Sequence, residues 1–203
     1  MSHALSTRGW VSHSRFLISI MILGAFIAIV FSLLVPLQYS SSVRLLITQA
    51  SAVGTDPYTA IKFTERIASN LSELLYSSSF ANNIIGQSKG LDPNTFPKDE
   101  YQRRKQWQKT IETSVTPGTG IMVITAYQRT REQATVLVDA AARELSLQAP
   151  NYFGSSVRVQ VIDAPLPSRW IARPNFIKNG IFGAVVGFLL GLMWVLGKKE
   201  KRG

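Results

Sequence analysis

The sequence contains no cysteine among its 203 residues. Disulfide bonds, thiol catalysis and cysteine-ligated zinc are therefore excluded, whereas the redox compartment stays undetermined. Any domain that this chain forms must be stabilised by its hydrophobic core alone.

Histidine is nearly as scarce, because His3 and His13 are the two in the sequence. The region that follows them lacks the residues that nucleophilic triads and the usual zinc sites require. Adjacent carboxylates at Asp99 and Glu100 would point about 100° apart on a helix, which favours a solvated helix start over a glycosidase pair. The segment "GLMWVLGKK" (191–199) resembles a phosphate-binding loop, but five residues rather than four separate its glycines. We predict no enzyme activity, no cofactor and no metal site.

Charge is absent from two long apolar runs. The first, "FLISIMILGAFIAIVFSLLV" (16–35), holds about 20 residues, which at about 1.5 Å rise per residue span the ~30 Å core of a bilayer. The second, Asn179 to Gly197, is about as long. Signal peptides have apolar regions of only about 7–15 residues, and the following "PLQYSSS" is a poor cleavage site. We predict transmembrane helices at residues 16–36 and 179–197.

The net charge of +10 is distributed in a way that indicates orientation. Of 22 basic and 12 acidic residues, two basic ones precede Phe16, and four basic ones with one acid follow Gly197, which leaves 16 and 11 between. Positive flanks favour the cytoplasmic side, and long domains are exempt from that rule. We expect a multi-pass protein of the inner or plasma membrane with cytoplasmic tails at 1–15 and 198–203. A nucleic-acid partner is not expected.

The region between the apolar runs alternates strand and helix patterns. Alternating apolar residues predict a strand at 39–48, two strands around a Pro-Gly turn within 113–128, and a strand within 155–165. Capping signals at Asp56-Pro57 and at Thr130 with Gln133 open two of the helices. The helices are predicted at 58–76, 77–86, 98–112 and from 130 onward. This order indicates an α+β protein with a ferredoxin-like extracytoplasmic domain at 37–163.

The same patterns predict which side chains are buried. We expect one buried stripe in helix 58–76, a second stripe in the helix after Thr130, and inward-facing valines in the last strand. In the strand at 121–126 apolar residues occupy both faces, so cover on both faces is expected. The predicted core residues are Ile61, Ala68, Leu71, Leu75, Ala134, Leu137, Val138, Ala141, Leu145, Val157, Val159 and Val161.

Three prolines punctuate a predicted connector at 164–178. Pro165, Pro167 and Pro174 lack amide donors and hold φ near −65°, which favours an extended, stiff link. Arg169, Trp170, Arg173 and Lys178 are expected at the outer head-group layer, with Trp194 at the opposite boundary.

Glycines recur every four residues in the second apolar run, at Gly183, Gly187 and Gly191. Such a ridge lets another helix approach backbone to backbone, which supplies van der Waals attraction within a bilayer. The partner is either the chain's own first helix, through Gly24 and Ala28, or a neighbouring subunit.

A polar helix in the domain interleaves cations with an aromatic residue. Arg103, Arg104, Lys105 and Trp107 are candidates for contact with a glycan or with lipid head groups. The alternative is a solvated helix face without a ligand.

Three segments occur in a recognisable order: "YSSSVRLLI", "GTGIMVITA…REQATVLVDAAARELS" and "VIDAPLPSRWIARPN…NGIFGAVVGFLLG". Their order and their spacing from both apolar runs resemble the polysaccharide co-polymerase, or chain-length determinant (Wzz-like), family over nearly the whole chain. The resemblance departs in two respects: "SRWIAR" widens the gap before Pro174, and the domain lacks a long helical extension. The second departure is similar to the compact branch of the family.

This resemblance implies a membrane scaffold that regulates the length or export of a cell-surface polysaccharide. It implies a homo-oligomer that works with a polysaccharide polymerase. A cytoplasmic tyrosine kinase, if one acts with it, would be a separate polypeptide, because "KKEKRG" has no tyrosine and no nucleotide loop. The alternatives are a structural subunit of an envelope secretion or pilus-assembly complex and, less favoured, a membrane-bound enzyme.

Overall fold

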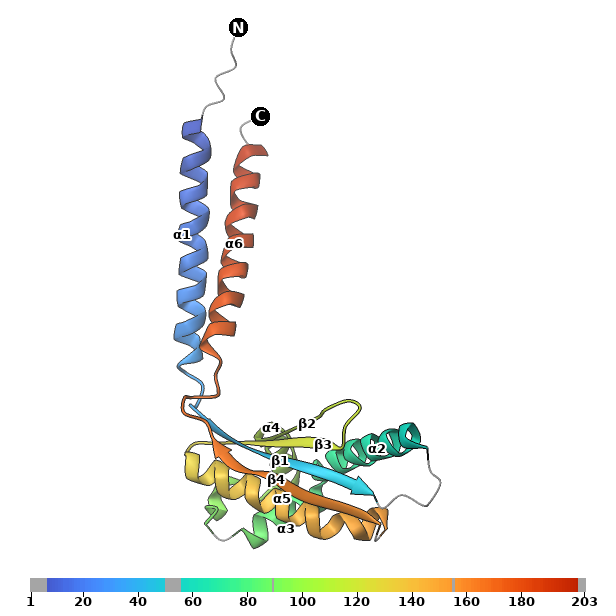
Figure 1. Cartoon of the computed structure of the whole chain (residues 1–203). Coiled ribbons are helices and arrows are strands. Elements are labelled where there is room, and N and C mark those ends of the chain that lie inside the picture. The colour runs from blue at the N-terminus through green and yellow to red at the C-terminus, as the bar shows by residue number, and fades with distance from the viewer. Residues whose placement is uncertain (1–6, 50–55, 89, 155, 201–203) are drawn as a thin grey trace. The chain divides into compact units, whose positions relative to one another are not determined.

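The computed structural model describes residues 7–49, 56–88, 90–154 and 156–200. The chain divides into two compact units. One contains the described residues up to Leu37 and from Arg173 onward, and the other contains Gln38–Ala172 (Figure 1). The ends of both predicted cytoplasmic tails, 1–6 and 201–203, and residues 50–55 after the first predicted strand lie outside the described residues.

The first unit is a pair of long antiparallel helices, α1 (Thr7–Ser32) and α6 (Phe176–Glu200) (Figure 1). Each contains a segment long and apolar enough to cross a membrane, Ser14–Ser32 in α1 and Phe176–Gly197 in α6. Helix α1 begins nine residues before the predicted start at Phe16 and ends at Ser32, four residues before the predicted end at residue 36. Helix α6 begins three residues before Asn179 and ends three residues after Gly197. The hydrophobic criterion marks where a helix could enter lipid, and it does not fix where the backbone hydrogen bonds of the helix begin and end.

The second unit is a mixed α+β domain with one four-stranded antiparallel sheet. The sheet order is β2-β3-β1-β4, so the first and last strands are neighbours. The elements are β1 (Tyr39–Gln49), α2 (Pro57–Leu75), α3 (Ser78–Gln87), a 3₁₀ turn (Pro93–Thr95), α4 (Glu100–Thr110), β2 (Ile111–Val115), β3 (Ile121–Gln128), α5 (Arg131–Phe153) and β4 (Val157–Pro167).

Side-chain caps fix where the helices of this unit begin. The Asp56 carboxylate accepts a hydrogen bond from the Thr59 amide at 3.1 Å, and the Thr130 hydroxyl accepts one from the Gln133 amide at 3.2 Å. Both capping predictions are confirmed. Asp99 performs the same task for α4, with the Gln102 amide at 2.9 Å, which agrees with its interpretation as a helix start.

One face of the sheet carries the core. Val43, Leu45 and Ile47 on β1 and Met122, Ile124 and Ala126 on β3 are buried, while the alternate side chains on β3 are half-buried. Because α2 and α5 pack on the buried face, the helices cover a single side of the sheet (Figure 1). The expectation that both faces of β3 are covered is therefore wrong.

Two predicted core residues are exposed. Ile61 is 45% exposed, because the core contacts of α2 begin only at Ile67 and its first turns lie beyond them. Val161 is 49% exposed, because β4 is an edge strand whose register with β1 shifts between Arg44 and Leu45. The other ten predicted core residues are buried.

Trp107 is the largest fully buried side chain. Its indole N–H donates to the Leu75 carbonyl oxygen at the end of α2 at 2.8 Å. Its ring centroid lies 5.9 Å from the ring centroid of Phe96. The indole therefore joins α4 to α2 with its one polar atom satisfied. This position overturns the expectation that Trp107 contacts a ligand at the surface.

Truncation of this indole should destabilise the domain strongly. We expect Trp107→Ala to lower the free energy of unfolding by about 3–5 kcal/mol, since it leaves a large cavity and an unpaired carbonyl. Urea unfolding of the full chain in detergent measures the loss. Tyr101→Ala, on the same helix but 75% exposed, should change stability by less than about 0.5 kcal/mol. Similar losses for both variants would contradict the burial described.

Candidate functional site

The glycine ridge of α6 packs against the chain's own first helix. A Cβ atom built on Gly183 would meet the Gly24 carbonyl oxygen and would lie 2.5 Å from the Ala28 Cβ. A Cβ on Gly187 would lie 2.5 Å from the Ile20 carbonyl oxygen. The two backbones are in direct contact at these positions, so only glycine fits. Of the two partners left open by the sequence, the structure places α1 on the ridge.

The contact loosens toward the C-terminal end of α6. A Cβ on Gly191 would lie 3.1 Å from the flexible end of the Leu17 side chain and 3.6 Å from the Ile20 Cβ. A Cβ on Gly197 would meet nothing within 4 Å. The closest approach is therefore centred on Gly183 and Gly187.

Specific contacts lie on either side of the glycines. The Asn179 side-chain amide donates to the Ser32 hydroxyl at 2.7 Å, and that hydroxyl donates to the Ala28 carbonyl oxygen at 2.9 Å. Toward the other end of the helix pair, the ring centroids of Phe16 and Trp194 lie 4.6 Å apart. A polar bond between apolar helices fixes their register, because sliding would leave the amide without its partner.

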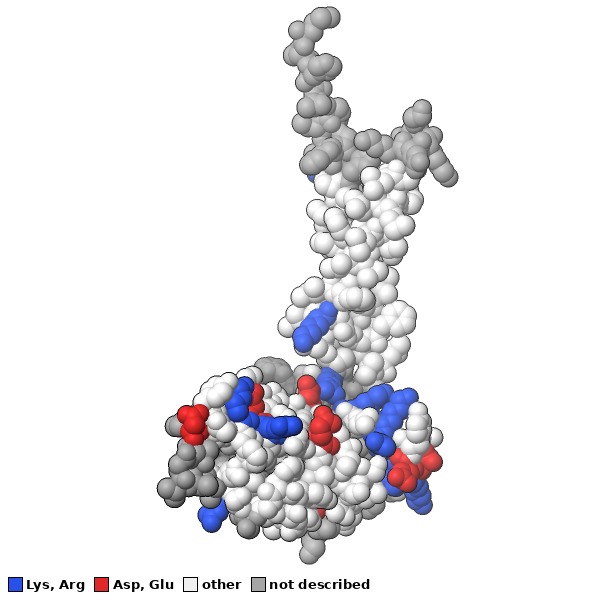
Figure 2. Space-filling model, turned by 90° about the vertical axis from the view of Figure 1, so that its right-hand side faces the viewer, with Lys and Arg blue, Asp and Glu red and all other residues white. Residues whose placement is uncertain are grey.

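The outward faces of this helix pair are apolar. Phe26, Phe182 and Met193 are each more than 60% exposed, and Figure 2 shows few charged side chains over the described part of the pair on the face viewed. Large exposed apolar surfaces require a cover of lipid or protein.

An engineered disulfide tests the helix contact. The 3.6 Å separation between the Ile20 Cβ and a Cβ at position 191 falls within the range that a disulfide spans. Because the chain has no native cysteine, Ile20→Cys with Gly191→Cys should oxidise to a bond within one chain. Adding Gly183→Leu should abolish the bond, whereas Gly197→Leu should preserve it. The readout is non-reducing gel mobility, and a bond formed mainly between two chains would contradict the contact.

The first two connector prolines belong to the sheet. Pro165 and Pro167 lie in β4, where Pro167 is in register with Ser41. The expectation of an independent connector from residue 164 is wrong for its first four residues. A proline cannot donate to a ladder, but β4 is an edge strand, so one side needs no donor. Pro174 lies beyond the second unit, in the segment that leads to α6.

The basic residues of α4 form no platform with an aromatic ring. Arg104 and Lys105 are exposed, whereas Arg103 is half-buried and donates to the Lys98 carbonyl oxygen at 3.1 Å. Trp107 points into the core. The combined site with these four residues is therefore not assembled, and α4 presents a solvated polar face.

Sequence reasoning missed a cluster where the first and last strands of the domain meet. The Arg131 guanidinium lies 5.0 Å from the centroid of the Tyr39 ring and donates to the Arg169 carbonyl oxygen. The Ser168 hydroxyl accepts from the Ser40 amide at 3.1 Å and donates to the Trp170 carbonyl oxygen at 2.9 Å. We call this region the stem end and define it as 38–40, 129–131 and 166–172. Its parts are far apart in sequence, so no local pattern reveals it.

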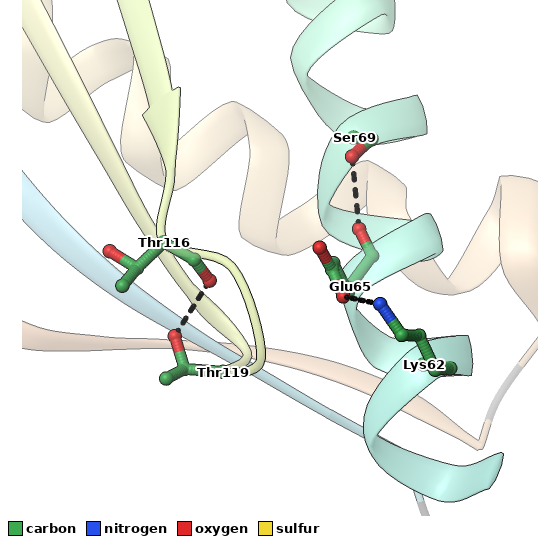
Figure 3. Close-up of polar contacts among 5 residues, drawn as sticks. All are labelled: Lys62, Glu65, Ser69, Thr116 and Thr119. Carbon is green, nitrogen blue, oxygen red and sulfur yellow. Dashed lines mark hydrogen bonds and ion pairs between the residues drawn. The ribbon is translucent and has the colours of Figure 1, made fainter. Parts of the chain in front are cut away.

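A shallow hollow on α2 is lined by Lys62, Glu65 and Ser69, among other residues. The Lys62 ammonium donates to the Glu65 carboxylate at 3.1 Å, and this hydrogen bond raises the pKa of Lys62. The Ser69 hydroxyl donates to the Glu65 carbonyl oxygen, and in the turn between β2 and β3 the Thr119 hydroxyl donates to the Thr116 carbonyl oxygen (Figure 3). These bonds are local to one helix and one turn, so they shape the surface without assembling a reactive group.

Within the described ranges, no group of three or more His, Cys, Asp or Glu side chains lies close enough to hold a metal ion. Comparison of the chain with protein-family models and with curated proteins gives no match.

Proposed function

We propose that this protein is a two-span membrane scaffold that regulates the chain length or export of a cell-surface polysaccharide. The single observation that carries the proposal is the pairing of β1 with β4. This pairing brings together the two points at which the chain leaves the domain toward its apolar helices. A domain held at both ends by adjacent helices is the organisation of the polysaccharide co-polymerase family, which the sequence resembles.

The topology of the domain supports this class. The antiparallel order β2-β3-β1-β4, with helices between β1 and β2 and between β3 and β4, supports the proposed ferredoxin-like arrangement. The hydrogen bonds continue past the strands, since the Ala172 amide donates to the Gln38 carbonyl oxygen at 2.8 Å. The two chain segments that leave the domain are therefore hydrogen-bonded to each other.

The apolar helices support a membrane location. Under this proposal α1 and α6 cross the inner or plasma membrane as an antiparallel hairpin, both termini are cytoplasmic, and the domain is outside. The positive flanks favour this orientation. The glycine contact and the Ser32–Asn179 hydrogen bond would stabilise the hairpin in lipid.

Assembly then has to use surfaces other than the Gly183–Gly187 contact. The ridge is occupied by α1 within one chain, so copies would associate through the outward apolar faces of the helices or through the domain. The proposed partners are further copies and a polysaccharide polymerase; a cytoplasmic tyrosine kinase, if one acts with the protein, would be a separate polypeptide.

Removal of the gene tests the function. We expect the surface polysaccharide of the deletion strain to lose its normal length distribution or its amount, and the full-length gene to restore it. Gel separation of extracted glycan gives the distribution. A variant that carries Gly183→Leu should insert but fail to restore the distribution, while Gly197→Leu should restore it. An unchanged distribution in the deletion strain would refute the proposal.

A further inference from the structure

We propose that the stem end docks on the head-group layer of an anionic phospholipid membrane. In this arrangement Arg131 and Arg169 bind lipid phosphates and Trp170 enters the interface. The inference rests on the proposed membrane-spanning role of α6. It extends the expectation that Arg169 and Trp170 lie at the head-group layer to a lipid-binding surface of the globular domain, which includes Arg131 and which neither the spans nor the scaffold function requires.

The apolar side chains of the stem end are unusually exposed for a soluble surface. Trp170 is 82% exposed and Leu166 is 76% exposed, and Ile171 follows Trp170 directly. Hydrogen bonds of Ser168 to Ser40 and to the Trp170 carbonyl hold the backbone of this segment against β1. An indole held outward in this way suits the boundary between water and lipid, because its ring is apolar and its N–H remains polar.

The charges of the stem end complement anionic head groups. Arg129, Arg131 and Arg169 are exposed there. The carboxylates beside them include Glu132 and Glu112, and Glu112 accepts a hydrogen bond from the Tyr127 hydroxyl at 2.9 Å. The Tyr39 ring and the Arg169 carbonyl orient the Arg131 guanidinium. A guanidinium carries five N–H donors in a planar fork, so one bond to a carbonyl still allows a two-point contact with phosphate.

Chain length keeps this surface close to the bilayer. Only residues 173–175 separate Ala172 from the first residue of α6, and an extended chain covers at most about 14 Å over those four steps. Other exposed apolar side chains, such as Tyr58 and Phe63 on α2, have no such tether to a candidate span. Linker length and charge together therefore favour lipid as the partner of the stem end.

Nitroxide labels on single cysteines test the docking in the full chain. Because the chain has no native cysteine, Leu166→Cys, Leu147→Cys and Leu189→Cys report on the stem end, on a distant part of α5 and on α6 respectively. All three native side chains are more than 50% exposed, so labelling should leave the fold intact. The reconstitution uses lipid nanodiscs of mixed phosphatidylglycerol and phosphatidylcholine, and discs of phosphatidylcholine alone. Accessibility to oxygen and to a water-soluble nickel chelate gives the depth of each label.

We expect the label at 166 to lie at the interface in anionic discs, the label at 147 in water and the label at 189 in hydrocarbon. Arg131→Gln and Arg169→Gln should each lower the ratio of docked to undocked domain about fivefold. Arg158→Gln, an exposed site at the far end of β4, should leave the ratio unchanged. Weaker docking in phosphatidylcholine discs would support the role assigned to lipid charge.

Two results would overturn the inference and leave the span intact. In the first, the label at 166 lies in water while the label at 189 lies in hydrocarbon. In the second, the label at 166 is shielded from the nickel chelate, but neither arginine substitution and no change of lipid charge alters that shielding. The latter would indicate a protein contact, such as a second copy. A label at 189 in water would instead refute the span, and the docking with it. Glycan length measured in the deletion strain is independent of all these labels.

Discussion

The antiparallel pairing of β1 with β4 is the constraint on which the organisation of this molecule depends. These strands are the first and last of the domain, and their ladder runs from Gln49 with Val157 to Ser41 with Pro167. Past the ladder, the Ser168 amide donates to the Ser40 carbonyl oxygen, and the Ala172 amide donates to the Gln38 carbonyl oxygen. A chain that enters and leaves a domain through one hydrogen-bonded stem delivers its two flanking helices to the same place, whatever the rest of the sheet does.

The helices α1 and α6 pack closely because small residues lie where they meet. Gly24 faces Gly183 and Gly187 with the backbones in contact, and Ser32 receives the Asn179 amide near the domain-proximal ends of the helices. In lipid the association of helices gains little from the hydrophobic effect, so close packing and polar bonds must supply it. The glycine ridge therefore joins two helices of one chain, and the proposed association of copies has to use other surfaces.

Local chemistry explains why much of the fold could be predicted from the sequence. The carboxylate of Asp56 and the hydroxyl of Thr130 cap the helices that follow them, and the alternation of Val43, Leu45 and Ile47 marks a half-covered strand. The failures have non-local causes. Trp107 is buried in the core, but its helix α4 has no apolar stripe, so the sequence periodicity does not indicate which face of the helix is buried. Likewise, β4 continues through Pro165 because an edge strand tolerates a missing donor.

The candidate sites were less predictable than the fold because each depends on contacts between distant segments. The ridge at Gly183 predicts a close partner but not its identity, since a second copy and α1 satisfy the same geometry. The stem end needs Tyr39, Arg131 and Arg169 from three separate elements. Only the sheet topology brings these residues together.

Under the proposed function, α1 and α6 would cross one membrane and hold the domain on its outer side. Labelling of intact cells with a membrane-impermeant maleimide tests it most directly, with single cysteines placed at Ser2, Leu147 and Gly203. The account predicts that only the cysteine at 147 reacts before the cells are permeabilised, and that all three react afterwards. A cysteine at 147 that reacts only after permeabilisation would contradict it, as would reaction of either terminal cysteine in intact cells.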